Sequence, residues 1–250
     1  MLRIIVGEAR RAGVDDICVV VCPGDEDAFS AAAGDQGLHF VAQEEPLGYG
    51  HAIYCAREFV GQEPFLHMVG DHIYVSAGGS GCVQQVVAAA EMHDCSISAV
   101  QATRENHLHL FGTVGGQRVR GTHDLYAIDR VVEKPTPTEA EQVLMVPGIR
   151  SGYYLCFLGT HVLSHVVMEL LEEEIQQRGR ADLSPILNRL AARERYLALE
   201  AHGQRYPVDV RYGLFTAQLA LALSGQDRDE VLTLLCDLLA HRQMTNTLNP

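Results

Sequence analysis

The chain has 250 residues, 47% of them hydrophobic, and a formal net charge of −13 at pH 7. A chain of this length and composition buries a full core, so a single α/β domain is the first expectation. The negative charge argues against a nucleic-acid partner, which requires a basic face. It does not exclude a small anionic ligand held by local donors and a metal. No apolar run reaches the length of about 18 residues that would predict a membrane span.

The N-terminus and the cysteines indicate a cytoplasmic protein. The first residues lack the apolar core and cleavage site of an export signal. The seven cysteines are odd in number, scattered and without a CxxC pair. We therefore expect buried free thiols in a reducing cytoplasm.

Helix-like and strand-like segments alternate through the first part of the chain. A helix is expected at residues 2–13, and continuous apolar runs predict strands at 16–24, 38–43, 65–71 and 96–103. A helix is also expected at residues 50–60, and residues 81–93 have the periodicity of an amphipathic helix.

The pattern changes at residues 112–135, which alternate with period two around Gly115 and Gly116. This pattern predicts antiparallel strands joined by a Gly-Gly turn. Beyond it we expect a strand at 151–157, helices at 159–178 and 183–193, and a short strand at 196–203. Two helices, at 212–224 and 228–241, close the chain.

Strands that alternate with helices predict a mostly parallel sheet covered by helices on both faces. We therefore expect one domain over residues 1–250 with a three-layer α/β/α, Rossmann-like fold and a small antiparallel insert. Residues 225–250 form its C-terminal helix and tail. Ligands of such sheets bind beyond the carboxyl ends of the strands. This rule predicts that five segments converge: Gln43 with the following glycine turn, Gly70-Asp71, Lys134, Gly152, and residues 207–209.

Lys134 is the only lysine beside 18 arginines. A sequence so biased toward arginine retains lysine where a compact ammonium is needed and a guanidinium does not fit. Chance survival of one lysine is the alternative.

Five segments, in this order, resemble those of the bacterial UTP–glucose-1-phosphate uridylyltransferases, of the sugar-phosphate nucleotidyltransferase superfamily. They read "QEEPLGYGHAIYCA", "FLHMVGDHIYV", "VVEKPTP", "SGYYLCF" and "RYPVDVRYGLFTAQLALAL". The resemblance covers essentially the whole chain. It implies the superfamily's nucleotide-diphospho-sugar transferase fold and attack by glucose 1-phosphate on the α-phosphorus of UTP, which forms UDP-glucose and expels pyrophosphate.

The resemblance also implies a nucleotide site and a metal site. Gln43, Gly48 and Gly50 correspond to residues that hold the base, where a glycine lets the backbone approach a flat base edge. Asp71 corresponds to an acid that binds the Mg²⁺ bridging the phosphates; its alternative is a helix N-cap or turn acid.

The sugar-phosphate site is implied by a second set of residues. Glu133 corresponds to a residue that accepts hydrogen bonds from sugar hydroxyls, and Lys134 to one that neutralises the sugar phosphate. Gly152 corresponds to a glycine that admits the sugar ring, although a tight strand entry is nearly as good an explanation. Asp71 and Lys134 are therefore the expected catalytic residues.

Two departures from the family's pattern stand out. The family begins with a strand and a Gly-rich phosphate loop, and this chain starts in the helix that follows them. The loss of a central strand would leave neighbouring strands with unpaired edges. We therefore expect Met1 to be internal to a longer natural protein; a genuinely shortened protein is the alternative.

The second departure concerns a metal-binding Asp of the family, which is Pro207 here. Asp209 faces the same side of the strand, displaced by about 6–7 Å, so either Asp209 takes over or one metal ligand is lost. Arg211 replaces a lysine of the family's sugar-phosphate site.

The leading hypothesis is thus a Mg²⁺-dependent uridylyltransferase whose partners are UTP, glucose 1-phosphate and UDP-glucose. The main alternative is a non-catalytic sugar-nucleotide-binding or interaction module; a nicotinamide dehydrogenase is distant, because its fingerprint loop is absent. We expect no nucleic-acid or membrane partner, and a homo-oligomer is left open.

Overall fold

The computed structural model describes residues 1–34, 37–76 and 79–246. The N-terminal part contains α1 (Leu2–Arg11), β1 (Ile17–Val21), α2 (Glu26–Ala33), β2 (Leu38–Ala42), α3 (Tyr49–Cys55), α4 (Arg57–Val60), β3 (Phe65–Met68) and β4 (His72–Val75). The middle contains α5 (Cys82–His93), β5 (Ser96–Arg104), the 3-10 helix η1 (Glu105–Leu110), β6 (Gly112–Arg118), β7 (Leu125–Glu133), α6 (Pro137–Val143) and β8 (Tyr153–Leu163). The C-terminal part contains α7 (Val166–Arg178), α8 (Leu183–Arg193), β9 (Tyr196–Glu200), β10 (Gln204–Pro207), α9 (Gly213–Ser224) and α10 (Arg228–Asn246).

The main sheet has six strands in the order β3-β8-β5-β9-β7-β6. β5 and β9 pair in parallel, and β3 runs the same way because both it and β5 are antiparallel to β8, which lies between them. β6 and β7 form the expected antiparallel insert. Antiparallel pairing also reaches beyond that insert, to β8 and to the β4–β10 ribbon.

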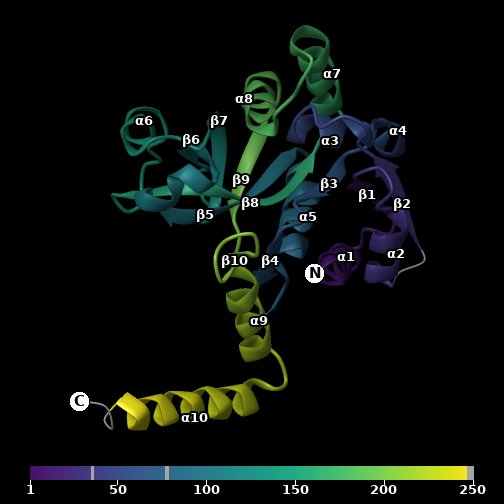
Figure 1. Cartoon of the computed structure of the whole chain (residues 1–250). Helices are drawn as coiled ribbons and strands as arrows, with labels where there is room; N and C mark the ends of the chain where they lie inside the picture. Colours follow the sequence, from purple (N-terminus) through teal and green to yellow (C-terminus); the bar gives the residue numbers. More distant parts are fainter. Residues whose placement is uncertain (35–36, 77–78, 247–250) are drawn as a thin grey trace.

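Helices cover both faces of this sheet, as expected (Figure 1). On β5, Ile97 and Ala99 belong to a core shared with α5, whereas Val100 belongs to a core shared with α7 and α8. Successive side chains of a strand point to opposite faces, so a continuous apolar strand supplies both cores. The α/β class and the three-layer arrangement are confirmed.

β1 and β2 form a separate parallel pair. In the described part of the chain, β1 pairs only with β2 and β3 pairs only with β8. Each of these two strands therefore has one edge without ladder hydrogen bonds to another described strand.

Several expected elements were wrong in detail. Residues 159–163 continue β8, and helix α7 begins only at Val166, because these residues pair with β3 and β5. Residues 50–60 form two short helices that meet at Ala56. The strand predicted at 65–71 ends at Met68.

The expected Gly-Gly turn was also wrong. Gly115 and Gly116 lie within β6, where the register to β7 shifts as in a β-bulge. A Cβ on Gly116 would collide with the Ala127 carbonyl of β7, and one on Gly115 would lie 2.9 Å from the Val143 carbonyl. These glycines therefore permit a bulge and close packing rather than a chain reversal.

The cysteines are free thiols, but only Cys82 and Cys156 are fully buried. Cys22 and Cys236 are exposed, which corrects the expectation that the thiols lie in the core.

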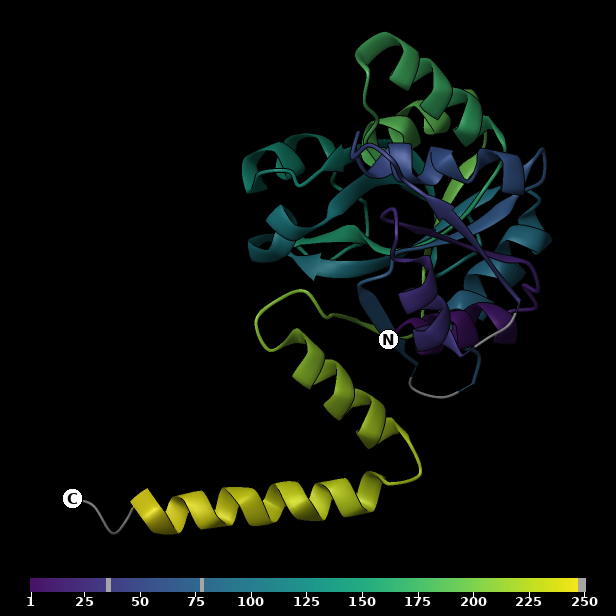
Figure 2. The same ribbon diagram turned by 45° about the vertical axis from the view of Figure 1, so that its right-hand side comes forward.

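α9 and α10 extend from the body as an arm (Figures 1 and 2). The arm starts after the β4–β10 ribbon. Its last residues, 247–250 of the expected tail, lie outside the described part of the chain. Among the described helices, α10 included, none combines the length and apolar character of a membrane-crossing segment.

Candidate active site

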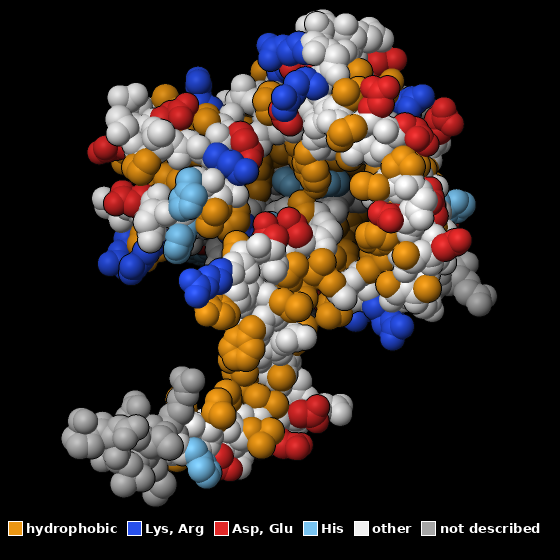
Figure 3. Space-filling view, in the orientation of Figure 1, with side chains coloured by type: hydrophobic (Ala, Val, Ile, Leu, Met, Phe, Trp, Pro, Cys, Tyr) orange, Lys and Arg blue, Asp and Glu red, His pale blue; other side chains and the backbone are white. Residues whose placement is uncertain are grey.

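A cavity of about 500 Å³ opens where several loops meet beside the main sheet. Its lining comes from five segments: Tyr49 at the start of α3, residues 69–72 from the end of β3 to the start of β4, Leu110 and Phe111 at the end of η1, Glu133 and Lys134 at the end of β7, and Pro207, Asp209 and Val210 at and just beyond the end of β10. In the space-filling view the molecule is hollowed near its centre, above the base of α9 (Figure 3). The structure thus brings together Asp71, Glu133, Lys134 and Asp209 from distant parts of the sequence.

Asp71 carries an unsatisfied oxygen into this cavity. Its Oδ1 is buried and has no hydrogen-bond partner among the described residues. The nearest cationic candidate is His72, whose Nε2 lies 3.8 Å away. Burial lowers the pKa of His72, and its Nδ1 lies 3.0 Å from the Leu158 carbonyl, an acceptor only. The ring therefore holds its proton on Nδ1, and Nε2 presents a lone pair toward Asp71.

With no proton on His72 Nε2, the imidazole cannot donate a hydrogen bond to the Asp71 carboxylate. The buried Asp71 oxygen is therefore available to a cation. A buried carboxylate oxygen of this kind suits a hard divalent ion. Among the described residues no group of three or more His, Cys, Asp or Glu side chains is arranged to hold a metal. The described residues would therefore supply at most two side-chain ligands to an ion at Asp71, and the others would come from water and from substrate phosphates, as is common for Mg²⁺.

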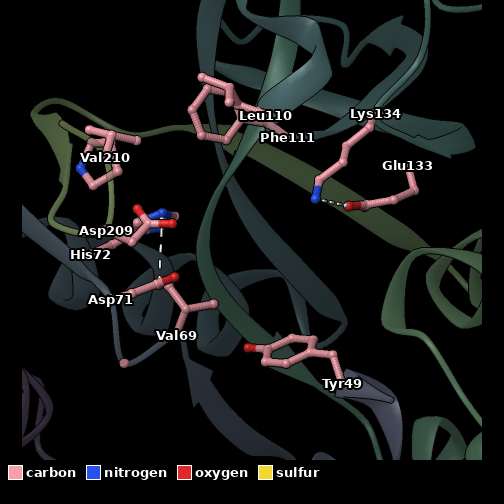
Figure 4. A pocket seen from close by; sticks show the side chains of 12 residues that line it. Tyr49, Val69, Asp71, His72, Leu110, Phe111, Glu133, Lys134, Asp209 and Val210 are labelled. Carbon is pink, nitrogen blue, oxygen red and sulfur yellow. Dashed lines mark ion pairs between the residues drawn. The ribbon is translucent and has the colours of Figure 1, made fainter.

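The β4–β10 ribbon brings Asp209 to the same cavity. Pro207 faces His72 in the ribbon register, and the Val208 N–H donates to the Asp71 carbonyl at 2.9 Å. This bond fixes the chain one residue before Asp209. Asp71 and Asp209 lie on one side of the cavity (Figure 4).

Glu133 and Lys134 face them from the opposite side (Figure 4). The Lys134 Nζ lies 3.9 Å from Glu133 Oε1, and the other Glu133 oxygen accepts a 2.5 Å hydrogen bond from Ser184. The Lys134 backbone adopts φ of 47°, and its N–H donates to the Phe111 carbonyl at 3.2 Å. A non-glycine residue in this conformation is strained and is common at functional sites. The strain supports a specific role for this single lysine.

Arg205 lies behind the cavity wall and was missed in the sequence. Its guanidinium donates to the Phe157 carbonyl and lies 3.4 Å above the ring of Phe111, which lines the cavity. Burial lowers the pKa of Arg205 to about 10, well above neutrality. A positive charge of this kind favours anions in the neighbouring cavity. The feature of the sequence that could have identified Arg205 is its position two residues before Pro207.

Tyr49 and His67 were also missed. The Tyr49 hydroxyl lies 2.9 Å from His67 Nε2, and His67 faces His161 across β3 and β8 with ring centroids 5.5 Å apart. His161 Nδ1 in turn lies 2.6 Å from the Ser98 hydroxyl. These contacts link the cavity wall to the core. No local sequence pattern predicts them, because the paired residues lie on different strands.

The expected base-binding residues do not line the cavity, although Tyr49 between the two glycines does. The Gln43 side-chain amide donates to the Gly48 carbonyl at 3.2 Å and lies 2.9 Å from His51 Nδ1. Gly48 has φ of 106°, and its Cβ would collide with the Ala181 carbonyl. On Gly50 a Cβ would lie 2.8 Å from Leu171. The glycines therefore allow α3 to pack against the segment before α8.

Gly152 and Arg211 are not brought to the cavity either. Gly152 lines a different hollow with Arg104 and Arg150. It precedes β8 and lies seven residues, or roughly 20 Å along an extended strand, from Gly159, which is the residue of β8 beside Val69 and His72 of the cavity. No neighbour approaches its Cβ position, and a φ of 74° explains the glycine. Arg211 is exposed and stacks on Tyr212, 5.0 Å from the ring centroid.

A family described as nucleotidyl transferase matches residues 1–206, which is most of the chain. The chain belongs to the nucleotidyl transferase family. The cavity lies within the matched residues except for its last part, Pro207, Asp209 and Val210.

Two proteins with similar sequences are both named UTP–glucose-1-phosphate uridylyltransferase. A UTP–glucose-1-phosphate uridylyltransferase of Bacillus subtilis (strain 168) is 28% identical over 265 residues, which covers 95% of this chain and 86% of that protein. One of Streptococcus pneumoniae serotype 4 is 26% identical, covering 95% and 85%.

Solved structures show the same fold. A UDP-glucose pyrophosphorylase complexed with UDP-glucose superposes with a TM-score of 0.74 at 21% identity, covering 88% of this chain and 85% of that one. A UTP-bound enzyme of Acinetobacter baumannii gives 0.75 at 20% identity, covering 95% and 87%. The nucleotide-diphospho-sugar transferase fold expected from the sequence is confirmed.

Proposed function

We propose that this nucleotidyl transferase forms UDP-glucose and pyrophosphate from UTP and glucose 1-phosphate. The observation that carries the proposal is the arrangement of one cavity. An unsatisfied Asp71 oxygen and Asp209 lie on one side, and the Glu133–Lys134 pair lies on the other. The names of the similar proteins favour a uridine nucleotide and a glucose phosphate as the substrates.

In the reaction a phosphate oxygen of glucose 1-phosphate attacks the α-phosphorus of UTP in line. One oxygen–phosphorus bond forms, the bond to the β-phosphate breaks, and its electron pair leaves with pyrophosphate. Such a transfer depends on positioning and charge neutralisation, and it requires no protein nucleophile.

Each residue has one task in this scheme. Lys134 neutralises the sugar phosphate, and Glu133, oriented by Ser184, accepts hydrogen bonds from sugar hydroxyls. Asp71 and Asp209 would hold a Mg²⁺ ion, which supplies charge neutralisation and alignment of the phosphates when bound. The Arg205 charge behind Phe111 favours the anionic substrates within the cavity.

We also infer that the protein works in the cytoplasm. Its described cysteines are all unpaired thiols, as expected in a reducing compartment.

The test is pyrophosphate release by the purified chain from UTP and glucose 1-phosphate, with and without Mg²⁺. We expect turnover that requires Mg²⁺ and falls by roughly 100-fold or more in Asp71→Asn. Glu45→Gln, an exposed acid outside the cavity, is the matched control and should retain wild-type turnover.

Calorimetric titration with UDP-glucose separates the proposal from its alternative. Binding without turnover would favour the non-catalytic sugar-nucleotide-binding module. One observation supports this alternative: Lys134 is the single Lys or Arg that lines the described cavity. A folded chain that neither binds nor turns over would contradict both.

A further inference from the structure

Tyr49 lines the cavity, and a buried histidine holds its hydroxyl. Tyr49 is the first residue of α3, and its hydroxyl lies 2.9 Å from Nε2 of His67 on β3. The two rings meet edge-on, with a centroid distance of 5.7 Å. The hydroxyl is turned toward the side of the cavity on which Asp71 lies (Figure 4). Two elements that are distant in the sequence thus fix one phenol in the cavity wall.

The position of the proton on His67 decides what this hydroxyl can do. Burial lowers the pKa of His67 to about 4, so at neutral pH the ring is uncharged and carries one N–H. Its Nδ1 is buried and has no hydrogen-bond partner among the described residues. Proteins leave a buried N–H without a partner more rarely than a buried acceptor. The proton is therefore on Nε2, and this N–H donates to the Tyr49 oxygen.

This arrangement leaves the phenolic O–H of Tyr49 free. A tyrosine hydroxyl has one proton of its own to donate, and the His67 N–H uses only its capacity to accept. In the described part of the chain the hydroxyl has no second hydrogen-bond partner. Burial raises the pKa of Tyr49, so the hydroxyl keeps its proton at neutral pH. Tyr49 is thus a neutral hydrogen-bond donor available to a ligand.

Other donors are scarce in this cavity. Its side chains include three carboxylates and one ammonium group, that of Lys134. The N–H of His72 is directed to the Leu158 carbonyl. Among the side chains that line the described cavity, Lys134 and Tyr49 are therefore the ones that can donate to a ligand. A phosphate monoester carries about two negative charges and three acceptor oxygens, so one ammonium group leaves acceptors unpaired.

We propose that Tyr49 donates its hydroxyl proton in a hydrogen bond to the phosphate of the bound sugar phosphate, and that His67 is a positioning residue that holds this hydroxyl. The inference rests on the proposed function, because it assigns a second contact to the phosphate that Lys134 neutralises there. In UDP-glucose and in UDP this group is the β-phosphate, and UMP lacks it.

Calorimetric titration of the full chain with UDP-glucose, UDP and UMP, in the presence of Mg²⁺, tests this contact without requiring turnover. Tyr49→Phe should weaken binding of UDP-glucose and UDP alike by roughly 10- to 100-fold, because a hydrogen bond to a charged group is lost. Binding of UMP should not change. Tyr54→Phe is the matched control, since Tyr54 lies on the same helix outside the cavity and should alter none of the three affinities.

Variants of His67 separate positioning from packing. His67→Leu removes the N–H and should weaken UDP binding by roughly 5- to 10-fold, with no further loss when it is combined with Tyr49→Phe. His67→Gln supplies an amide N–H and should restore UDP affinity to within about threefold of the wild type. Urea denaturation at neutral pH checks that each variant is folded. Additive losses in the double variant would overturn the role of His67.

Unchanged UDP affinity in Tyr49→Phe would overturn the phosphate contact. A loss for UDP-glucose alone would overturn it as well, because the hydroxyl would then contact a sugar oxygen. Pyrophosphate release tests the proposed function separately. A wild-type chain without turnover, whose UDP affinity falls in Tyr49→Phe, would support the contact and contradict the proposed function. A wild-type chain that binds none of the three nucleotides would contradict both.

Discussion

At the scale of the residue, Lys134 combines two unusual properties. It is the one lysine of the chain, and it holds a positive φ of 47° at the end of β7. Its backbone hydrogen bond to Phe111 ties this conformation to the cavity wall. Strain of this kind persists where the surrounding structure fixes it, and here it sets the direction of an ammonium group.

The first prediction concerns that ammonium. Lys134→Ala should raise the KM for glucose 1-phosphate by roughly 10- to 100-fold, because a charge-assisted contact is lost. The KM for UTP should change little. Initial-rate kinetics with each substrate varied in turn measure both values, and Arg120→Ala, an exposed cation outside the cavity, serves as the control. Equal loss for both substrates would contradict the role assigned to Lys134.

The residues that sequence reasoning found in the cavity are those at predicted strand ends. Asp71, Glu133 and Lys134 lie at the ends of strands that the sequence predicts. Asp209 was considered because Pro207 stands where the family has a metal-binding Asp. Arg205, His72 and Tyr49 were missed because their positions depend on contacts between distant segments, such as the pairing of β4 with β10. Gly152 and Arg211 were placed by resemblance of short segments, and the strand that begins after Gly152 carries it away from the cavity.

At the scale of the element, the glycine turn before α3 has two possible roles, which are packing of α3 and binding of the nucleotide. Substitution of Gly48 distinguishes them. Gly48→Ala should destabilise the fold by roughly 2–4 kcal/mol, because the Cβ collides with the Ala181 carbonyl at a positive φ. Gly179→Ala, at φ of 70° with open space around it, should cost only about 1 kcal/mol.

Urea denaturation measures both free energies of unfolding. If Gly48→Ala unfolded like the wild type while its affinity for UTP fell, the glycine would serve the nucleotide rather than the packing of α3.

The pairing of β3 with β8 predicts a pH dependence. Burial lowers the pKa of His67 to about 4, and burial together with His67 lowers that of His161. Between pH 6.5 and about 4 the unfolded chain binds a proton at His67 that the folded chain does not, so stability falls as the pH falls.

His67→Gln should therefore remove part of the acid sensitivity, up to about 3 kcal/mol between pH 7 and pH 4. Urea denaturation across this range checks it, with His123→Gln as an exposed control. An unchanged pH profile in His67→Gln would show that the folded state accommodates the charged ring.

At the scale of the whole molecule, the layers were predictable and the pairings were not. Alternating apolar and amphipathic segments predict helices on both faces of a sheet, because each strand must supply two cores. The reversal of β8 between β3 and β5 leaves no trace in its own sequence, since a buried strand reads as a continuous apolar run in either direction. For the same reason the end of β8 was taken for the start of a helix.

The separation of β1–β2 from the six-stranded sheet gives the last prediction. Both main cores include β5 and β8, whereas β1 and β3 each have an unpaired edge in the described part of the chain. Backbone amides without ladder partners exchange through small local openings. Hydrogen exchange followed by mass spectrometry should therefore show faster exchange in β1 and β3 than in β5, by roughly 100-fold or more. Saturating UDP-glucose should slow exchange in the two segments that contribute to the cavity wall, residues 69–72 and 207–210, more than in β1. Uniform exchange across β1, β3 and β5 would mean that the two sheets open as one cooperative unit, held together by the helices on both faces rather than by the strands.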